Sequence, residues 1–108
     1  MRSVYIAGPY TADTEQEIDE NISRAASVAA DYIRQGWAVF CPHTMTSLID
    51  RKFNADGKIT YENWLTIDFY WLSKCDAVHF LPGWEHSNGA KLEHMVAESL
   101  GKAIILGG

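Results

Sequence analysis

The chain has 108 residues, a length that fits a single domain spanning residues 1–108. Hydrophobic residues make up 47% and charged residues 21%, which is ordinary for a globular protein and excludes a collagen, a coiled coil or a disordered tail. Nine Lys and Arg residues against 14 Asp and Glu residues give a net charge of −5, so a partner such as duplex nucleic acid, which requires a basic face, is not expected.

The sequence also indicates the cellular compartment in which the protein is expected. No apolar run approaches the roughly 20 residues that span a bilayer, and no basic and apolar leader stands at the N-terminus. Cys41 and Cys75 form no CxxC pair. We therefore expect a reduced, cytoplasmic protein with no membrane partner.

Short β-rich runs alternate with helical patterns along the first half of the chain. Residues 3–7 (SVYIA) predict a strand, and the capping-box pattern from Thr14 to Glu17 predicts the start of a helix. Apolar residues at helical spacing continue to Ile33. A second strand is predicted at 37–41, ended by Pro42, and an irregular segment at 42–59.

The second half continues the alternation. Helices are predicted at about 60–74 and at 89–100, and strands at 77–81 and 103–106. Repeated strand–helix–strand units predict an α/β fold, a single-domain three-layer sandwich of flavodoxin or Rossmann type with a parallel sheet of about four to five strands. Ligands of such folds bind at the carboxyl ends of the strands.

Asp68 lies within an apolar stripe of the predicted second helix, four residues after Trp64 and four before Leu72. A carboxylate there costs several kcal/mol unless it is paired or faces a cleft. Two interpretations stay open: Asp68 lines a functional cleft, or it is structural, capping backbone or pairing with an Arg such as Arg51.

Glu93 falls near the start of the predicted third helix, on the border of its apolar side. A carboxylate near a helix N-terminus is favoured in its ionised form and can serve as a nucleophile or a base. A solvated first-turn Glu is the ordinary alternative. Just before this helix, Ser87, Asn88 and Gly89 present groups that suit an anion such as phosphate, or a plain N-cap.

These residues together resemble the nucleoside 2-deoxyribosyltransferase-like superfamily, near its 2′-deoxynucleoside 5′-phosphate N-hydrolases. The resemblance rests on three segments: Tyr5 to Pro9 (YIAGP); Asp68 with Cys75 to Val78 (CDAV); and Ser87 to Glu93 (SNGAKLE). It implies the parallel fold already predicted, a small-molecule nucleotide or nucleoside as partner, and a homodimer or larger homo-oligomer.

The resemblance also implies roles for individual residues. Glu93 matches the nucleophile, Asp68 the residue that assists at the base and sugar, and Tyr5 the strand residue that orients the nucleophile. Ser87 matches the serine that holds the phosphate in the monophosphate hydrolases. The Arg that follows the first strand in those hydrolases has no counterpart in Tyr10, Thr11 and Ala12.

The remaining candidates lie at the predicted strand ends. Substrate contacts are expected from Gly8, Pro9, Tyr10, His43, Trp84, Ser87, Asn88 and Gly89. Tyr10 and Trp84 have the rings to stack on a base, although packing and interfaces use the same residue types. His79, inside a predicted strand, is expected in the core. The histidines lack HxxxH or HExxH spacing, so no metal is expected, and the resembled chemistry needs no cofactor.

The resemblance thus implies cleavage of the N-glycosidic bond of (deoxy)nucleoside 5′-monophosphates through a Glu nucleophile. Two alternatives stay open: a nucleoside 2-deoxyribosyltransferase, and a non-catalytic protein that binds or sequesters nucleotides. A plain oligomerisation domain is a fourth reading.

Overall fold

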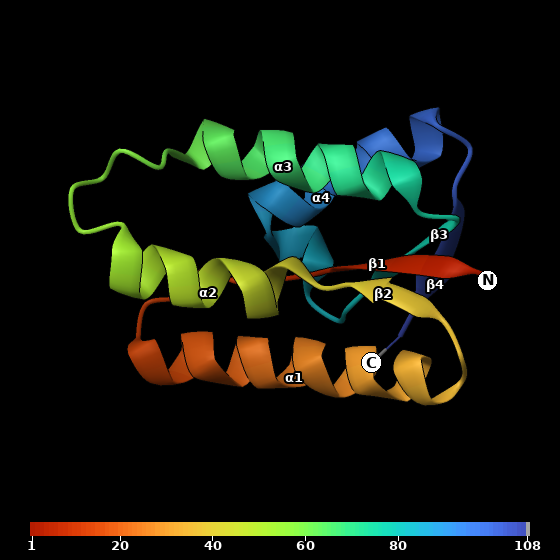
Figure 1. The fold of residues 1–108 in the computed structure, drawn as a ribbon, viewed down its shortest axis with the longest axis horizontal. Coiled ribbons are helices and arrows are strands. Elements are labelled where there is room, and N and C mark those ends of the chain that lie inside the picture. Colours follow the sequence, from red (N-terminus) through yellow and green to blue (C-terminus); the bar gives the residue numbers. More distant parts are fainter. Residues whose placement is uncertain (108) are drawn as a thin grey trace.

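The computed structural model describes residues 1–107, and within them four parallel strands form one sheet (Figure 1). The strands are β1 (Ser3–Ala7), β2 (Ala38–Phe40), β3 (Ala77–Phe80) and β4 (Ala103–Leu106). They are ordered β2-β1-β3-β4, so Tyr5 of the central strand β1 is in register with Phe40 on one side and Val78 on the other. The predicted α/β class and the parallel sheet of about four to five strands are confirmed, with four strands in the described residues.

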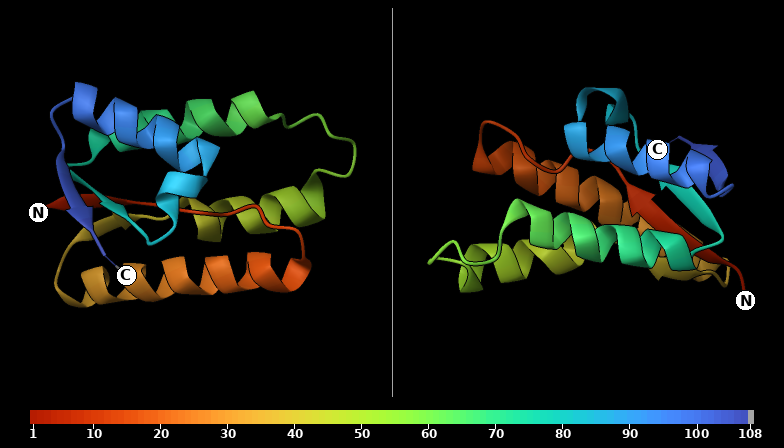
Figure 2. Two further views of the ribbon diagram at one scale, coloured as in Figure 1. Left: turned by 180° about the vertical axis from the view of Figure 1, so that it is seen from behind. Right: turned by 90° about the horizontal axis from the view of Figure 1, so that it is seen from above.

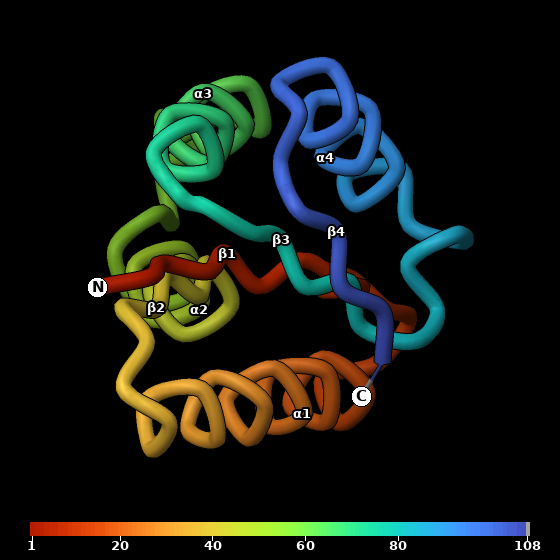
Figure 3. Tube along the Cα trace, turned by 90° about the vertical axis from the view of Figure 1, so that its right-hand side faces the viewer, coloured from red at the N-terminus to blue at the C-terminus, as the bar shows by residue number. Residues whose placement is uncertain are grey.

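Four α-helices surround the sheet. They are α1 (Glu15–Arg34), α2 (Pro42–Phe53), α3 (Tyr61–Lys74) and α4 (Asn88–Ser99), with a short 3₁₀ turn, η1 (Trp84–His86), before α4. Seen end-on, α1 covers one face of the sheet while α3 and α4 cover the other (Figure 3). The helices α3 and α4 contact each other and lie side by side in both views of Figure 2.

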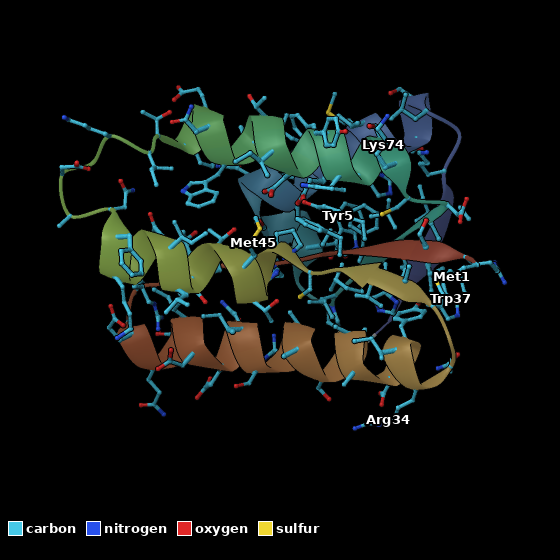
Figure 4. The ribbon with its side chains drawn as sticks, in the orientation of Figure 1. Met1, Tyr5, Arg34, Trp37, Met45 and Lys74 are labelled. Carbon is cyan, nitrogen blue, oxygen red and sulfur yellow. The ribbon has the colours of Figure 1, made fainter. Side chains whose placement is uncertain are left out.

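Strand β1 supplies both faces of the core because its side chains alternate. Val4 and Ile6 belong to the apolar cluster beneath α1, while Tyr5 and Ala7 belong to the cluster beneath α3 and α4. The alternation aims Tyr5 toward the helix that carries Glu93, and Figure 4 shows its side chain on that side of the sheet.

Side chains cap the starts of α1 and α3, and the first of these caps was predicted from the sequence. The Thr14 hydroxyl accepts a hydrogen bond from the backbone N–H of Glu17 and donates to that residue's carboxylate. At α3, Thr60 and Asn63 exchange bonds in a complete capping box. The predicted apolar face of α1 is partly wrong, since Ile33 is 61% exposed while Val28 and Tyr32 are buried.

The segment expected to be irregular contains the helix α2, so this prediction is wrong for residues 42–53. Pro42 ends β2 as expected, but it also occupies the first helical turn, where its fixed φ is favourable and its missing N–H costs nothing. Figure 1 shows α2 extending the line of β2 beyond the sheet, between the starts of α1 and α3. Helix α2 therefore forms a wall at the edge of the sheet where ligands are expected.

Among the described residues 1–107, no helix is both long and apolar enough to cross a bilayer.

Candidate functional site

A cavity of about 900 Å³ opens at the carboxyl ends of the strands. Its wall includes Gly8 after β1, His43 at the start of α2 and Gly83 after β3. The sheet order reverses between β1 and β3, and clefts of open α/β sheets form at such a reversal. The cavity thus lies where the parallel fold predicts a ligand.

The cavity brings most of the predicted site residues together. Asp68 and Glu93 both line it, and so do Gly8, Pro9, Tyr10, His43, Ser87, Asn88 and Gly89. Tyr5 is fully buried behind the wall and reaches the site through its hydroxyl, which donates a hydrogen bond to Glu93 Oε2. Residues from α3 and α4, distant in sequence, therefore converge on one space.

Trp84 is not among the residues that line the cavity. Its ring stacks on His94, with centroids 4.4 Å apart, and lies against Phe80. Its predicted contact with a base has no support from this position, whereas packing accounts for it. Tyr10, by contrast, lines the cavity and meets His43 edge-on at 5.8 Å.

Glu93 is buried, with 7% of its surface exposed, so it is not the solvated first-turn residue of the alternative interpretation. Burial raises the pKa of Glu93 to about 8, the charge on Asp68 raises it as well, and the Tyr5 hydroxyl opposes the shift by hydrogen bonding to the carboxylate. Burial and the two nearby carboxylates in turn hold the pKa of Tyr5 well above its usual value, so Tyr5 remains a donor.

Asp68 has no ion-pair partner at Arg51. That guanidinium contacts Asp19 at 2.8 Å and Glu15 at 3.5 Å, so the predicted structural pairing is wrong. Burial raises the pKa of Asp68 to about 6, and its Oδ1 atom is buried without a hydrogen-bond partner. Asp68 is therefore unsatisfied in the free protein.

Two more cavity residues carry unsatisfied atoms. Within residues 1–107, the buried side-chain nitrogen and oxygen atoms without partners are Asp68 Oδ1, Trp64 Nε1 and His43 Nδ1, and all three residues line the cavity. His43 Nε2 lies 2.8 Å from the carbonyl oxygen of Pro9, which only accepts, so Nε2 carries the proton and Nδ1 is a bare acceptor. Buried unpaired polar groups are costly, and a bound ligand that pairs them removes the cost.

Some lining residues were not predicted from the sequence. Trp64 is the clearest, and it stands one helical turn before Asp68 on the same face of α3, a spacing that could have identified it. The others include Asp13 and Glu17, near the start of α1, and Asp50 on the unpredicted helix α2. His79 lies in the core as expected, bonded to Tyr32 Oη at 2.7 Å and to the Gly107 carbonyl.

The N-terminus of α4 lies at the wall of the cavity. The Ser87 hydroxyl accepts the backbone N–H of Ala90 at 3.2 Å, so Ser87 is the N-cap and also lines the cavity. Both roles predicted for it are compatible. In the described part of the chain, no group of three or more His, Cys, Asp or Glu residues is arranged to hold a metal ion.

The fold around this cavity is that of the 2-deoxyribosyltransferases. The structure of a 2-desoxiribosyltransferase from Leishmania mexicana matches with a TM-score of 0.64 and 19% identity, over 98% of this chain and 63% of that enzyme. A 2-deoxyribosyltransferase from Bacillus psychrosaccharolyticus matches with a TM-score of 0.63 and 24% identity, over 96% of this chain and 70% of that enzyme. The chain thus spans less than two thirds of the length of the Leishmania enzyme.

The family follows from the sequence itself. Residues 2–106 match the family described as a domain of unknown function, DUF4406, and the chain belongs to it. A comparison with curated proteins gave no match. The expected similarity to the nucleoside 2-deoxyribosyltransferase-like superfamily is confirmed at the level of the fold.

Proposed function

We propose that this protein is an enzyme that cleaves the N-glycosidic bond of a (deoxy)nucleoside or its 5′-monophosphate, with Glu93 as the nucleophile. The observation that carries the proposal is the convergence of Glu93, its donor Tyr5 and Asp68 on one cavity. The fold it shares with 2-deoxyribosyltransferases supports the same chemistry.

The chemistry proceeds in two balanced steps. The Glu93 carboxylate attacks C1′, the C1′–N bond breaks, and its electron pair leaves with the base, which takes a proton from Asp68. A water molecule then attacks C1′ of the glycosyl ester, gives its proton to Asp68, and releases Glu93 as a carboxylate. Tyr5 positions Glu93 by hydrogen bonding to Oε2.

The acceptor in the second step decides whether the reaction is a hydrolysis or a transfer. If water is the acceptor, the protein is an N-hydrolase; if a second base attacks C1′ and gives its proton to Asp68, it is a deoxyribosyltransferase. Incubation of one deoxynucleoside with an excess of a different base separates the two, because a transferase forms the new nucleoside faster than free deoxyribose appears.

The direct test is release of free base from a panel of deoxynucleosides and their 5′-monophosphates, followed by chromatography. Glu93→Gln removes the nucleophile and keeps the side-chain volume, so we expect base release to fall by about 10³-fold or more. Glu98→Gln is a matched control, because it is the same substitution on the same helix at a residue that pairs with His94 and does not line the cavity.

Base release that survives Glu93→Gln would contradict the assigned nucleophile. Absence of base release across the whole panel, with measurable binding of the same compounds, would replace the enzyme with a nucleotide-binding protein. The raised pKa of Glu93 is the observation that favours this second candidate, since a protonated carboxyl group is a poor nucleophile.

A further inference from the structure

The cavity is lined by acidic side chains, and no Lys or Arg residue stands among them. Five carboxyl groups face it, those of Asp13, Glu17, Asp50, Asp68 and Glu93. None of the nine Lys and Arg residues of the chain lines it. A ligand in this space therefore meets a predominantly negative field.

The Arg51 guanidinium lies beside the cavity residue Tyr10 and is already paired with carboxylates. Arg51 is close enough to Tyr10 to lower the pKa of that hydroxyl, against a larger upward effect of burial, but its own charge is paired with Asp19 and Glu15. His43 contributes no positive charge, because burial lowers its pKa and its Nε2 proton is committed to Pro9. His86 is the other histidine on the wall.

The helix N-termini do not offset the carboxyl groups. All four α-helices begin at this edge, and each N-terminus acts as about half a positive charge, or roughly two charges together. At neutral pH Asp68 and Glu93 together hold one proton, so four of the five carboxyl groups are charged, and these four still outnumber that contribution. A 5′-phosphate adds about two negative charges to the same space.

The uncharged hydrogen-bonding groups of the wall favour a different ligand. His43 has 4% of its surface exposed and presents a bare Nδ1 acceptor, and Trp64 presents an unpaired indole N–H. These groups suit the neutral donors and acceptors of a nucleoside. The Ser87 hydroxyl, which keeps a free proton to donate, suits a 5′-hydroxyl group.

From this charge distribution we propose that the site takes the uncharged nucleoside and rejects its 5′-monophosphate, with Asp13, Glu17 and Asp50 as the determinants. The inference rests on the proposed function and narrows its substrate class. On this proposal the N-terminus of α4 contacts the sugar and does not bind a phosphate group.

The test compares kcat/KM for 2′-deoxyadenosine with that for its 5′-monophosphate, and likewise for the other common bases. We expect the nucleoside to be favoured by at least about tenfold at low ionic strength. Added salt narrows the difference, because it screens the repulsion of the phosphate. Equal or faster cleavage of the monophosphates would overturn the inference while leaving the proposed function intact.

Charge-neutralising variants locate the determinants. The double variant Asp13→Asn, Asp50→Asn should raise kcat/KM for the monophosphate relative to the nucleoside by about tenfold. Asp31→Asn is the matched control, because Asp31 is exposed near the far end of α1, where it pairs with Arg34, and it changes the net charge without touching the cavity. The same gain in the control would mean that the cavity acids are not the cause.

Calorimetric titration of Glu93→Gln separates this inference from the catalytic proposal. Binding of 2′-deoxyadenosine without binding of its monophosphate supports the inference even if no turnover is found. Tighter binding of the monophosphate overturns it, and absence of binding by either compound overturns the inference and the proposed function together.

Discussion

At the scale of single residues, the site depends on two carboxyl groups that share one environment. Burial raises the pKa of Glu93 to about 8 and that of Asp68 to about 6, and the charge on Asp68 contributes to the shift of Glu93. Between these values the pair holds a single proton. Because Glu93 has the higher pKa, this proton resides mainly on Glu93. The proposed first step proceeds from the minor form in which Asp68 holds the proton, since Glu93 must attack as a carboxylate while Asp68 protonates the base.

This pair predicts a bell-shaped dependence of kcat/KM on pH, with its maximum between about pH 6 and pH 8. Below this range both groups are protonated and no nucleophile exists; above it both are ionised and no acid remains. The profile is measured as initial rates of base release from pH 4.5 to 9.5. In Asp68→Asn the alkaline limb should disappear, and an unchanged bell in that variant would exclude Asp68 as the acid.

The site residues that could be predicted from the sequence are those whose polarity conflicts with their apolar neighbours. Asp68 and Glu93 could be predicted, because a carboxylate beside apolar neighbours at helical spacing conflicts with ordinary burial. Trp64 gave no such conflict, since an aromatic residue on an apolar face is usual. Asp13 and Asp50 resemble ordinary surface acids, and only the three-dimensional arrangement places them on the cavity wall.

At the scale of elements, the helices that begin with a side-chain N-cap were predicted, and the helix that begins without one was missed. The starts of α1 and α3 are marked by Thr14 and Thr60, and both were predicted within a residue or so. Helix α2 was missed because its first half is rich in Thr and Ser, which have modest helix propensity, and its Cys41 N-cap makes no side-chain hydrogen bond. Its tertiary contact with α1 is not visible in the local sequence.

The close approach of two strand ends predicts that Gly8→Ala destabilises the protein. A Cβ atom at residue 8 would lie 2.8 Å from Leu81 Cβ and from its Cδ1 atom, and Leu81 is buried. We expect a loss of about 1–3 kcal/mol in the free energy of unfolding, measured by denaturant titration. The loop after β1 cannot move away freely, because Leu81 N–H donates to the Ala7 carbonyl oxygen at 2.8 Å.

Gly89→Ala provides the comparison for this substitution. Its added Cβ would meet only Tyr61 Oη, at 3.5 Å, which is an ordinary contact, and its position in the first turn of α4 favours Ala. Stability should therefore be unchanged or slightly higher. Equal destabilisation by both substitutions would show that the contact with Leu81 is not responsible.

At the scale of the whole molecule, the polar groups that line the cavity lower the stability of the folded protein. The carboxyl groups of Asp68 and Glu93 are held in a poorly solvated space, and polar atoms of Trp64 and His43 are left unpaired there. The two apolar clusters on either face of the sheet supply the stability that tolerates these groups. Strain of this kind is typical of binding sites and active sites, where function rather than stability selects the residues.

The cost of burying Glu93 can be measured, because it makes the free energy of unfolding depend on pH. Its pKa rises from an ordinary value of 4.5 in the unfolded chain to about 8 when folded, so the folded state retains a proton that the unfolded state releases. Stability is therefore lost as pH rises from about 4.5 to about 8, and is unaffected by this group at lower pH. Glu93→Gln removes the titrating group and should be more stable than the natural protein at pH 8.5, by up to about 5 kcal/mol.

The measurement is the midpoint of denaturant unfolding at pH 4.5, 6.5 and 8.5, followed by tryptophan fluorescence. The difference in unfolding midpoint between Glu93→Gln and the natural protein should be small at pH 4.5 and should increase at pH 6.5 and again at pH 8.5. Glu98→Gln, at an exposed residue of the same helix, should show no such growth. A constant difference at all three pH values would mean that Glu93 is not held in its protonated form by burial, and the paired titration with Asp68 would lose its basis.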